Sequence, residues 1–172
     1  MPANTPRLET ERLVLRRFTP ADVEPLFSLM RDREVNTFLP WFPLETEADA
    51  AKYLEEHYLD YYRPIGYLHV DDGESHDLGY ALARPSWGRG YMTEAAAAVV
   101  ERLRADGLPF LTATHDADNP KSGAVMERIG MTYRYSYEEL WQPKNRLVIF
   151  RMYQMDLNGT WPTYRAYRDR WP

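Results

Sequence analysis

The chain has 172 residues, a formal net charge of −5 and no cysteine, and 44% of its residues are apolar. This length supports one hydrophobic core, so we expect a single domain over 1–172 that ends in an aromatic tail over 158–172. The lack of thiols excludes disulfides and thiolate metal sites, while the acidic balance disfavours nucleic acid as a partner. Because no apolar run is long enough to span a membrane and no cationic leader opens the chain, we expect a cytoplasmic protein without a membrane partner.

The N-terminal third of the sequence predicts one strand and two helices. A β-rich run over Leu13–Phe18 predicts the strand, and Thr19 can cap the helix that follows it. The apolar residues of that helix recur at helical spacing, at Val23, Leu26, Phe27 and Met30. Phe38–Pro43 interrupts regular structure with two prolines, and it forms either a loop packed on the core or a wall of the substrate pocket. Thr46 can cap a second helix that runs to about Tyr62.

A β-hairpin is predicted next. Its strands cover Ile65–Val70 and Leu78–Ala83, and the turn lies at Asp71–Gly73. In the second strand, large residues alternate with small ones, which are Gly79, Ala81 and Ala83. One face of this strand is therefore expected to be almost bare of side chains, as a ligand lying along the backbone would require.

The second strand leads into a glycine-flanked turn and an alanine-rich helix that ends near Asp106–Gly107. Gly88 and Gly90 allow the backbone to turn tightly and to approach a ligand closely. The first N–H groups of the helix lack intrahelical partners and lie at the positive end of its dipole, and Arg89 adds a positive charge. This pattern predicts an anion site that suits a phosphorylated ligand.

The C-terminal half predicts a strand, a helix and a long hairpin. The strand covers Phe110–His115, and Asn119 can cap a helix that ends at Gly130. Met131–Trp141 and Leu147–Leu157 then form the terminal hairpin. The strand–helix–strand–helix order predicts parallel pairing of the two central strands, with the ligand at their carboxyl ends.

The aromatic tail carries Trp161, Tyr164, Tyr167 and Trp171 at roughly helical spacing. Such a tail forms either a helix or turn that covers the sheet, or a subunit contact. We therefore expect a monomer or a homodimer.

Four segments in a fixed order carry a resemblance to a known family: Leu8–Arg17, Leu78–Tyr80, Trp87–Ala95 and Asn119–Met131. Together they resemble the GNAT superfamily of N-acetyltransferases, in its RimJ/RimL-like branch. The resemblance implies an α+β (α/β-like) GNAT fold, with a mixed central sheet of about six strands and flanking helices. The family has a three-stranded meander before Gly79, for which this chain has too few residues. One strand is thus expected to be missing at Arg63–Pro64, either from the protein or from the sequence as given.

The resemblance also implies acetyl-CoA as co-substrate, with transfer of the acetyl group to a primary amine by direct attack in a ternary complex. The amine belongs to a small molecule or to a protein N-terminus. The pyrophosphate is expected on the Gly88–Thr93 amides and the pantetheine arm along the Leu78–Ala83 strand. Met92 departs from the superfamily's pattern, as does Trp87, and its side chain could narrow the approach of the pyrophosphate. The implied cofactor-binding residues are Leu82, Ala83, Trp87, Gly88, Arg89, Gly90, Tyr91, Met92, Thr93, Asn119 and Ser122.

Three residues are candidates for the acid–base chemistry. Ser122 matches the family position proposed to protonate the leaving thiolate, although it could instead only bond the helix start. Glu139, on the same strand face as Tyr137 and Trp141, is favoured over Glu138 as the base, and both could be solvated strand residues. His115 is a further candidate base, with a structural role as its alternative. Solvent water could also take the proton.

The oxyanion of the transition state would be stabilised by backbone N–H groups near Ala81 or Leu82. No metal site is expected, because the four histidines do not have ligand spacing. Two other functions stay open: a non-catalytic sensor or scaffold that binds CoA or acyl-CoA, and a dimerising structural domain built on the aromatic tail.

Overall fold

The computed structural model describes residues 7–57 and 65–169, which fall into two compact units. Unit 1 contains the described residues up to Tyr67 together with Tyr80–Ala95. Unit 2 contains Leu68–Gly79 together with the described residues from Ala96 onward. The assignment of one domain to 1–172 stays a prediction, and the two units are treated separately below.

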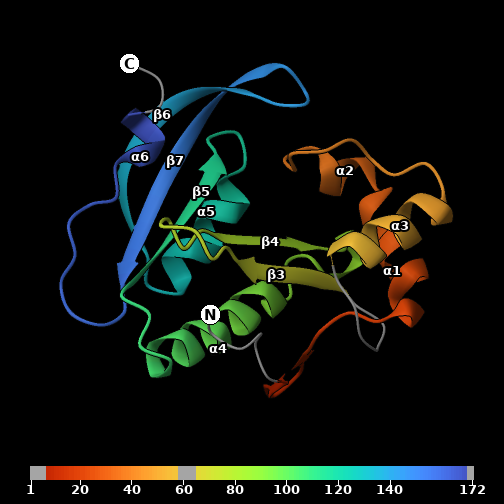
Figure 1. Cartoon of the computed structure of the whole chain (residues 1–172), viewed down its shortest axis with the longest axis horizontal. Coiled ribbons are helices and arrows are strands. Elements are labelled where there is room, and N and C mark those ends of the chain that lie inside the picture. Colours follow the sequence, from red (N-terminus) through yellow and green to blue (C-terminus); the bar gives the residue numbers. More distant parts are fainter. Residues whose placement is uncertain (1–6, 58–64, 170–172) are drawn as a thin grey trace. The chain divides into compact units, whose positions relative to one another are not determined.

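Unit 1 begins with two short strands and continues with helices (Figure 1). The elements are β1 (Leu8–Glu9), β2 (Val14–Leu15), the 3₁₀ turn η1 (Pro20–Asp22), α1 (Val23–Met30), α2 (Arg33–Asn36) and α3 (Glu47–His57). β1 pairs antiparallel with β2. The predicted strand over Leu13–Phe18 is shorter than expected. Beyond its end Arg16 forms an ion pair of 2.8 Å with Asp22, and Phe18 enters the core. β1 and α2 were not predicted.

The predicted helix starts are confirmed by their hydrogen bonds. Oδ2 of Asp22 accepts the N–H of Thr19 at 2.7 Å, which ties the chain before α1. Before α3, Oδ2 of Asp49 accepts the N–H of Thr46 at 2.9 Å, and Asp49 donates its own N–H to the Thr46 hydroxyl at 3.1 Å. This is a reciprocal cap of the helix start. The end predicted near Tyr62 lies outside the described residues.

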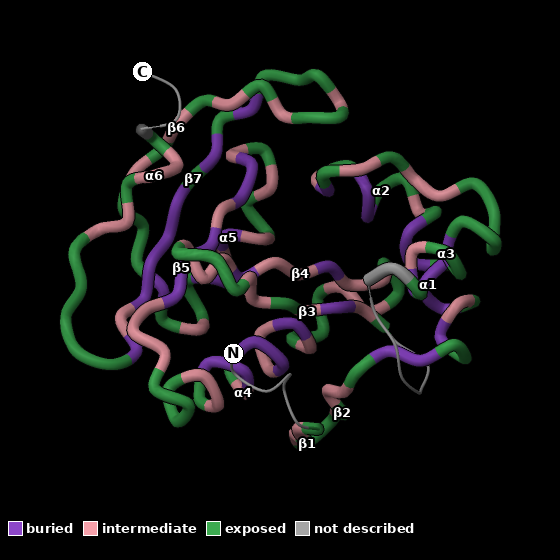
Figure 2. Tube along the Cα trace, in the orientation of Figure 1, coloured by how far each residue is buried: buried purple, intermediate pink, exposed green. Residues whose placement is uncertain are grey.

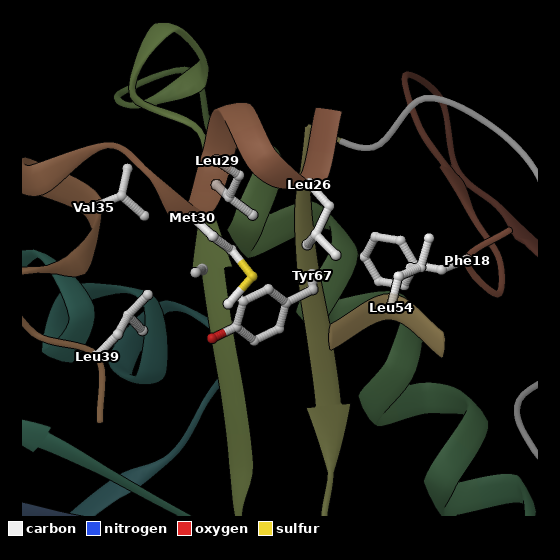
Figure 3. Packing of buried hydrophobic residues seen from close by; sticks show 9 residues of the cluster. Phe18, Leu26, Leu29, Met30, Val35, Leu39, Leu54 and Tyr67 are labelled. Atoms are coloured by element: carbon white, nitrogen blue, oxygen red, sulfur yellow. The ribbon is translucent and has the colours of Figure 1, made fainter. Parts of the chain in front are cut away.

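The core of unit 1 forms where α1 and α3 bury their apolar faces (Figure 3). Leu26 and Met30 of α1, and Leu54 of α3, are each 1% exposed. Full burial of such a side chain contributes roughly 1.5–3 kcal/mol. The helical spacing seen in the sequence of α1 is thus confirmed. The buried cluster consists of Phe18, Leu26, Leu29, Met30, Val35, Leu39, Leu54, Tyr67 and Ala81.

The predicted hairpin is formed by β3 (Gly66–Val70) and β4 (Leu78–Leu82), which pair with each other. The expectation of a bare face on β4 is wrong. A Cβ on Gly79 would lie 2.3 Å from the His69 imidazole, and Ala81 belongs to the buried cluster. The small residues of β4 therefore make room for large neighbouring side chains rather than for an open face.

The described residues between α3 and β4 contain β3 alone. The Arg63–Pro64 junction, where a strand was predicted to be missing, lies outside the described residues.

Unit 2 is built on an antiparallel sheet in the order β5-β7-β6. Its strands are β5 (Phe110–Asp116), β6 (Thr132–Trp141) and β7 (Arg146–Asp156), and its helices include α5 (Pro120–Arg128) and α6 (Ala166–Asp169). The central strand β7 is buried over most of its length (Figure 2). The predicted strand, helix and terminal hairpin are confirmed.

The seven strands of the described chain form three sheets rather than one sheet of about six strands. The predicted parallel pairing of the two central strands is present as a single bridge, in which Asp77 pairs parallel with Thr112. The α+β class with helices and a mixed arrangement of strands is confirmed.

The aromatic tail covers the sheet of unit 2, which was one of its two predicted roles. The ring of Tyr167 stacks on that of Tyr137, with centroids 5.8 Å apart and planes 7° from parallel. The rings of Tyr164 and Phe110 also pack together, with their centroids 6.2 Å apart. Trp171 lies outside the described residues.

Candidate active site

The segment that was predicted to bind an anion lies in unit 1 and consists of a strand end, a glycine turn and a helix start. After β4 and the 3₁₀ turn η2 (Arg84–Ser86), Gly88 and Gly90 have φ angles of 72° and 79°, which favour glycine. The helix α4 (Tyr91–Ala105) follows, and its first bond joins the N–H of Glu94 to the carbonyl of Gly90 at 3.0 Å. The first-turn amides before Glu94 therefore lack an intrahelical acceptor and can bind an anion.

The turn is held by Arg12 and Glu94, and of these two residues the sequence alone did not indicate Arg12. Arg12 donates from Nη1 to the carbonyl of Arg89 at 2.9 Å and from Nε to Oε2 of Glu94 at 2.6 Å. Oε1 of Glu94 also accepts from Thr10, and this hydrogen bond is the main cause that lowers the pKa of Glu94. Arg12 lies within the family-like segment Leu8–Arg17, which was the one signal for it. Its partners are about 80 residues away in the sequence.

Trp87 shapes the edge of β4 that leads into the turn. Its indole N–H donates to the carbonyl of Leu82 at 2.6 Å. Met92 is 8% exposed, so its side chain packs in the interior. This burial gives no support to the expectation that the Met92 side chain narrows the approach to the turn.

The two predicted oxyanion donors differ in the direction of their N–H groups. Ala83 donates its N–H to Ile65 at 2.7 Å, on the β3 side of the hairpin. Because amides alternate between the two edges of a strand, Ala81 also points towards β3 and Leu82 points away from it. Leu82 is therefore the better placed donor. β4 pairs with β3 alone in the described chain, apart from the bridge at Asp77.

Asn119 and Ser122 lie at the start of α5 in unit 2. The Asn119 side chain accepts the N–H of Ser122 at 3.4 Å, so the predicted N-cap is confirmed. Ser122 is half-buried in the first turn of the helix. Ligand contacts of these two residues stay predictions.

His115 is buried beneath α5, at 5% exposure. Its Nδ1 lies 2.8 Å from the carbonyl of Asp116, and because a carbonyl only accepts, Nδ1 carries the hydrogen. Nε2 has no hydrogen-bond partner among the described residues, and a Cβ on Gly123 would lie 2.5 Å from it. Burial lowers the pKa of His115. This position favours the structural role over that of a base.

Glu139 lies on the half-buried face of β6 with Tyr137 and Trp141, while Glu138 is exposed. The predicted strand parity is confirmed. A cavity of about 490 Å³ runs along β6 at this point, lined by Ser136, Tyr137, Glu138, Glu139, Leu140, Leu147 and Arg168.

The structure does not bring the two candidate bases together. Glu139 lies opposite Val148 on β7, and His115 lies opposite Arg151. Since Val148 and Arg151 are three residues apart on one strand, the two candidates face opposite sides of the sheet.

A second cavity, of about 500 Å³, surrounds a carboxyl group that no motif indicated. Asp77 is half-buried, and burial raises its pKa to about 6. Tyr167 donates its hydroxyl to Asp77 at 3.0 Å. The cavity is lined by Asp71, Gly73, Glu74, Ser75, Asp77, Tyr164 and Tyr167.

In residues 7–57 and 65–169, no three His, Asp or Glu side chains gather as a metal site. No helix of these residues is long and apolar enough to cross a membrane.

Comparison with known proteins gives one family and a set of similar folds. Residues 12–132 match the model of a family described as Acetyltransferase (GNAT) domain. An acetyltransferase of the GNAT family from Bacillus anthracis is 22% identical, with a TM-score of 0.76 over 88% of this chain and 98% of that one.

Two further solved structures are similar at lower identity. RimL, a ribosomal L7/L12 alpha-N-protein acetyltransferase in complex with coenzyme A, is 18% identical with a TM-score of 0.75, over 88% of this chain and 97% of that one. The microcin C7 self-immunity acetyltransferase MccE, in complex with acetyl-CoA and AMP, is 17% identical. Its TM-score is 0.72, over 86% of this chain and 93% of that one. At these identities the likeness establishes the fold.

Proposed function

Because this chain belongs to the GNAT acetyltransferase family, as its sequence motifs indicated, we propose that it transfers the acetyl group of acetyl-CoA to a primary amine. The observation that carries the proposal is the glycine turn of unit 1, where Gly88 and Gly90 precede the first-turn amides of α4. A helix start of this kind suits the pyrophosphate of CoA. Two of the similar structures hold acetyl-CoA or CoA, which supports the same ligand here.

The pantetheine arm would lie along the edge of β4 that faces away from β3. Leu82 directs its N–H to this edge. Just before the turn, the indole N–H of Trp87 donates to the carbonyl of Leu82. An amide donor on this edge can stabilise the oxyanion that forms when an amine attacks the thioester. The Leu82 amide and the glycine turn, which both belong to unit 1, would thus supply electrostatic stabilisation and ligand binding.

The transfer forms a C–N bond and breaks a C–S bond in one ternary complex. Glu139 takes a proton from the attacking amine, since it is half-buried on β6 and lines the cavity along that strand. Ser122 protonates the leaving thiolate, and the positive end of the α5 dipole supports loss of its proton. The amine loses one proton to Glu139 and the thiolate gains one from Ser122, and proton exchange with water then restores both side chains.

The acceptor is a primary amine of a small molecule or of a protein N-terminus. RimL acts on a protein α-amine, and MccE is described with AMP. The acidic chain, at a net charge of −5, favours a cationic acceptor.

Release of free CoA thiol from acetyl-CoA, measured across a panel of amines, tests this function. We expect release that depends on both acetyl-CoA and an amine, and a fall of more than tenfold in Ser122→Ala. If Ser122→Ala retains its rate within twofold, the acid assignment is wrong. If acetyl-CoA binds and no amine is acetylated, the chain is a CoA sensor rather than an enzyme.

A further inference from the structure

We infer that Arg12 is a positioning residue for the acyl donor, holding the peptide between Arg89 and Gly90 so that the amides of the turn face the pyrophosphate before it binds. This inference rests on the proposed function, because it concerns how that same turn recognises acetyl-CoA.

The Arg12 side chain is fixed by three contacts of its planar guanidinium group. Nε donates to Glu94 at 2.6 Å, and Nη1 donates to the Arg89 carbonyl at 2.9 Å. The guanidinium carbon lies 4.7 Å from the centroid of the Tyr91 ring. A rigid planar donor with partners on several sides has one orientation, so the contact to the Arg89 carbonyl is well defined.

The bond to the Arg89 carbonyl sets the direction of the next amide. The peptide between Arg89 and Gly90 is trans, and the C=O and N–H of a trans peptide point in opposite directions. When Arg12 holds the oxygen on its own side, the N–H of Gly90 points away from Arg12. The carbonyl oxygen is thereby kept out of a site that binds an anion.

The turn needs this restraint because both of its glycines are conformationally free. Gly88 and Gly90 occupy the left-handed region, at φ angles of 72° and 79°, and glycine adopts positive and negative φ about equally readily. A Cβ on Gly88 would meet no atom within 4 Å, so packing does not restrain that position. Rotation of the peptide between them would turn a carbonyl towards the ligand.

Glu94 anchors Arg12 from the other end of the first helical turn. Its carboxylate accepts from the backbone N–H of Arg12 at 3.0 Å and from the Thr10 hydroxyl, besides the side chain of Arg12. Glu94 also donates its own N–H to Gly90 at 3.0 Å. Together these contacts of Arg12 and Glu94 form a brace, which joins the β1–β2 turn to both ends of the anion-binding turn. The brace engages both carboxylate oxygens of Glu94.

The brace acts mainly on binding rather than on folding. The Arg12 side chain is 43% exposed, and exposed ion pairs contribute little to stability. Ligand affinity, in contrast, depends on how much ordering the site still requires when the ligand arrives. Variants of Arg12 are therefore expected to fold.

Two acyl donors separate the nucleotide part of the ligand, which includes the pyrophosphate, from its pantetheine arm. We compare acetyl-CoA with acetylpantetheine, which lacks the pyrophosphate, and measure the Kd of CoA by calorimetry. In Arg12→Ala we expect the Kd of CoA and the KM of acetyl-CoA to rise roughly tenfold, with kcat unchanged. The kinetic constants for acetylpantetheine should not change. Arg12→Lys keeps the charge but loses the planar guanidinium group. Its Kd for CoA should lie between those of Arg12→Ala and the unaltered chain.

Arg7→Ala is the matched control. Arg7 lies directly before β1 and forms an exposed ion pair with Glu9 at 2.7 Å. It should bind CoA as the unaltered chain does.

Each other outcome overturns the inference. Equal affinity for CoA in Arg12→Ala and the unaltered chain shows that the brace does not position the site. An equal rise in KM for acetyl-CoA and for acetylpantetheine shows that Arg12 does not act through the pyrophosphate. If the unaltered chain binds no CoA, the proposed function fails and this inference fails with it.

Discussion

Tyr167 donates its phenolic hydroxyl to Oδ1 of Asp77 at 3.0 Å, across 90 positions of the sequence. This bond fastens the C-terminal tail to the residue that precedes β4. Burial raises the pKa of Asp77 from its ordinary value of 3.8 to about 6, against the opposing effect of the Tyr167 hydrogen bond. The folded chain therefore binds the Asp77 proton more tightly than the unfolded chain does.

This pKa predicts how stability depends on pH. Below about 3.8 the carboxyl group is protonated in both states, and its favourable contribution is lost as pH rises towards about 6. In Asp77→Asn the acceptor for Tyr167 remains and the charge is removed. We expect this variant to be more stable than the unaltered chain at pH 7.5, by about 1–3 kcal/mol, and to lose most of that advantage at pH 4.

Urea unfolding at the two pH values measures the difference. Asp72→Asn, at an exposed position of the same turn, is the control and should show no such change. An equal stability difference for Asp77→Asn at both pH values would contradict the raised pKa.

Glu139→Gln should lower kcat for acetyl transfer roughly 100-fold, as expected for loss of a general base. Glu138→Gln is the matched comparison, because Glu138 lines the same cavity but is more exposed than Glu139. Its kcat should stay unchanged. Steady-state rates with saturating acetyl-CoA check both. Equal rates in the two variants would show that the proton goes to another acceptor.

Gly123→Ala should destabilise the fold by about 1–3 kcal/mol, because the new Cβ would lie 2.5 Å from the buried His115 ring. In a His115→Ala background that clash is absent. The same change should then stabilise the chain by about 0.5–1 kcal/mol, which is the helix propensity of Ala over Gly. Denaturant unfolding of the four proteins gives the comparison. Destabilisation in both backgrounds would contradict the packing of His115 on α5.

Met92→Ala tests whether that side chain belongs to the interior or to the anion site. At 8% exposure, its truncation should cost about 2–4 kcal/mol of stability. The KM for acetyl-CoA should stay unchanged. A lower KM without loss of stability would instead show that the Met92 side chain narrows the pyrophosphate site.

Much of the local structure could be predicted because its causes are local. Thr46 with Asp49, and Asn119 with Ser122, cap helices through bonds that span only three residues. The glycine turn before α4 is set by positive φ angles that few residues other than glycine adopt. Such signals lie within a short stretch of sequence.

The rest depends on contacts between distant segments, which periodicity does not encode. Arg12 and the turn it holds are 77 positions apart. The small residues of β4 predicted an open face, but His69 on the neighbouring strand lies over Gly79. His115 suits a base by its chemistry, and only the packing of α5 shows that its Nε2 is covered.

Acetyl transfer to an amine is tested most directly by following the acetyl group itself. Acetyl-CoA labelled with carbon-13 in its acetyl group is incubated with the chain and an amine panel, and the amines and the free CoA thiol are quantified. We expect labelled amide in an amount equal to the thiol released. Thiol release without labelled amide, or no transfer to any amine, would contradict it.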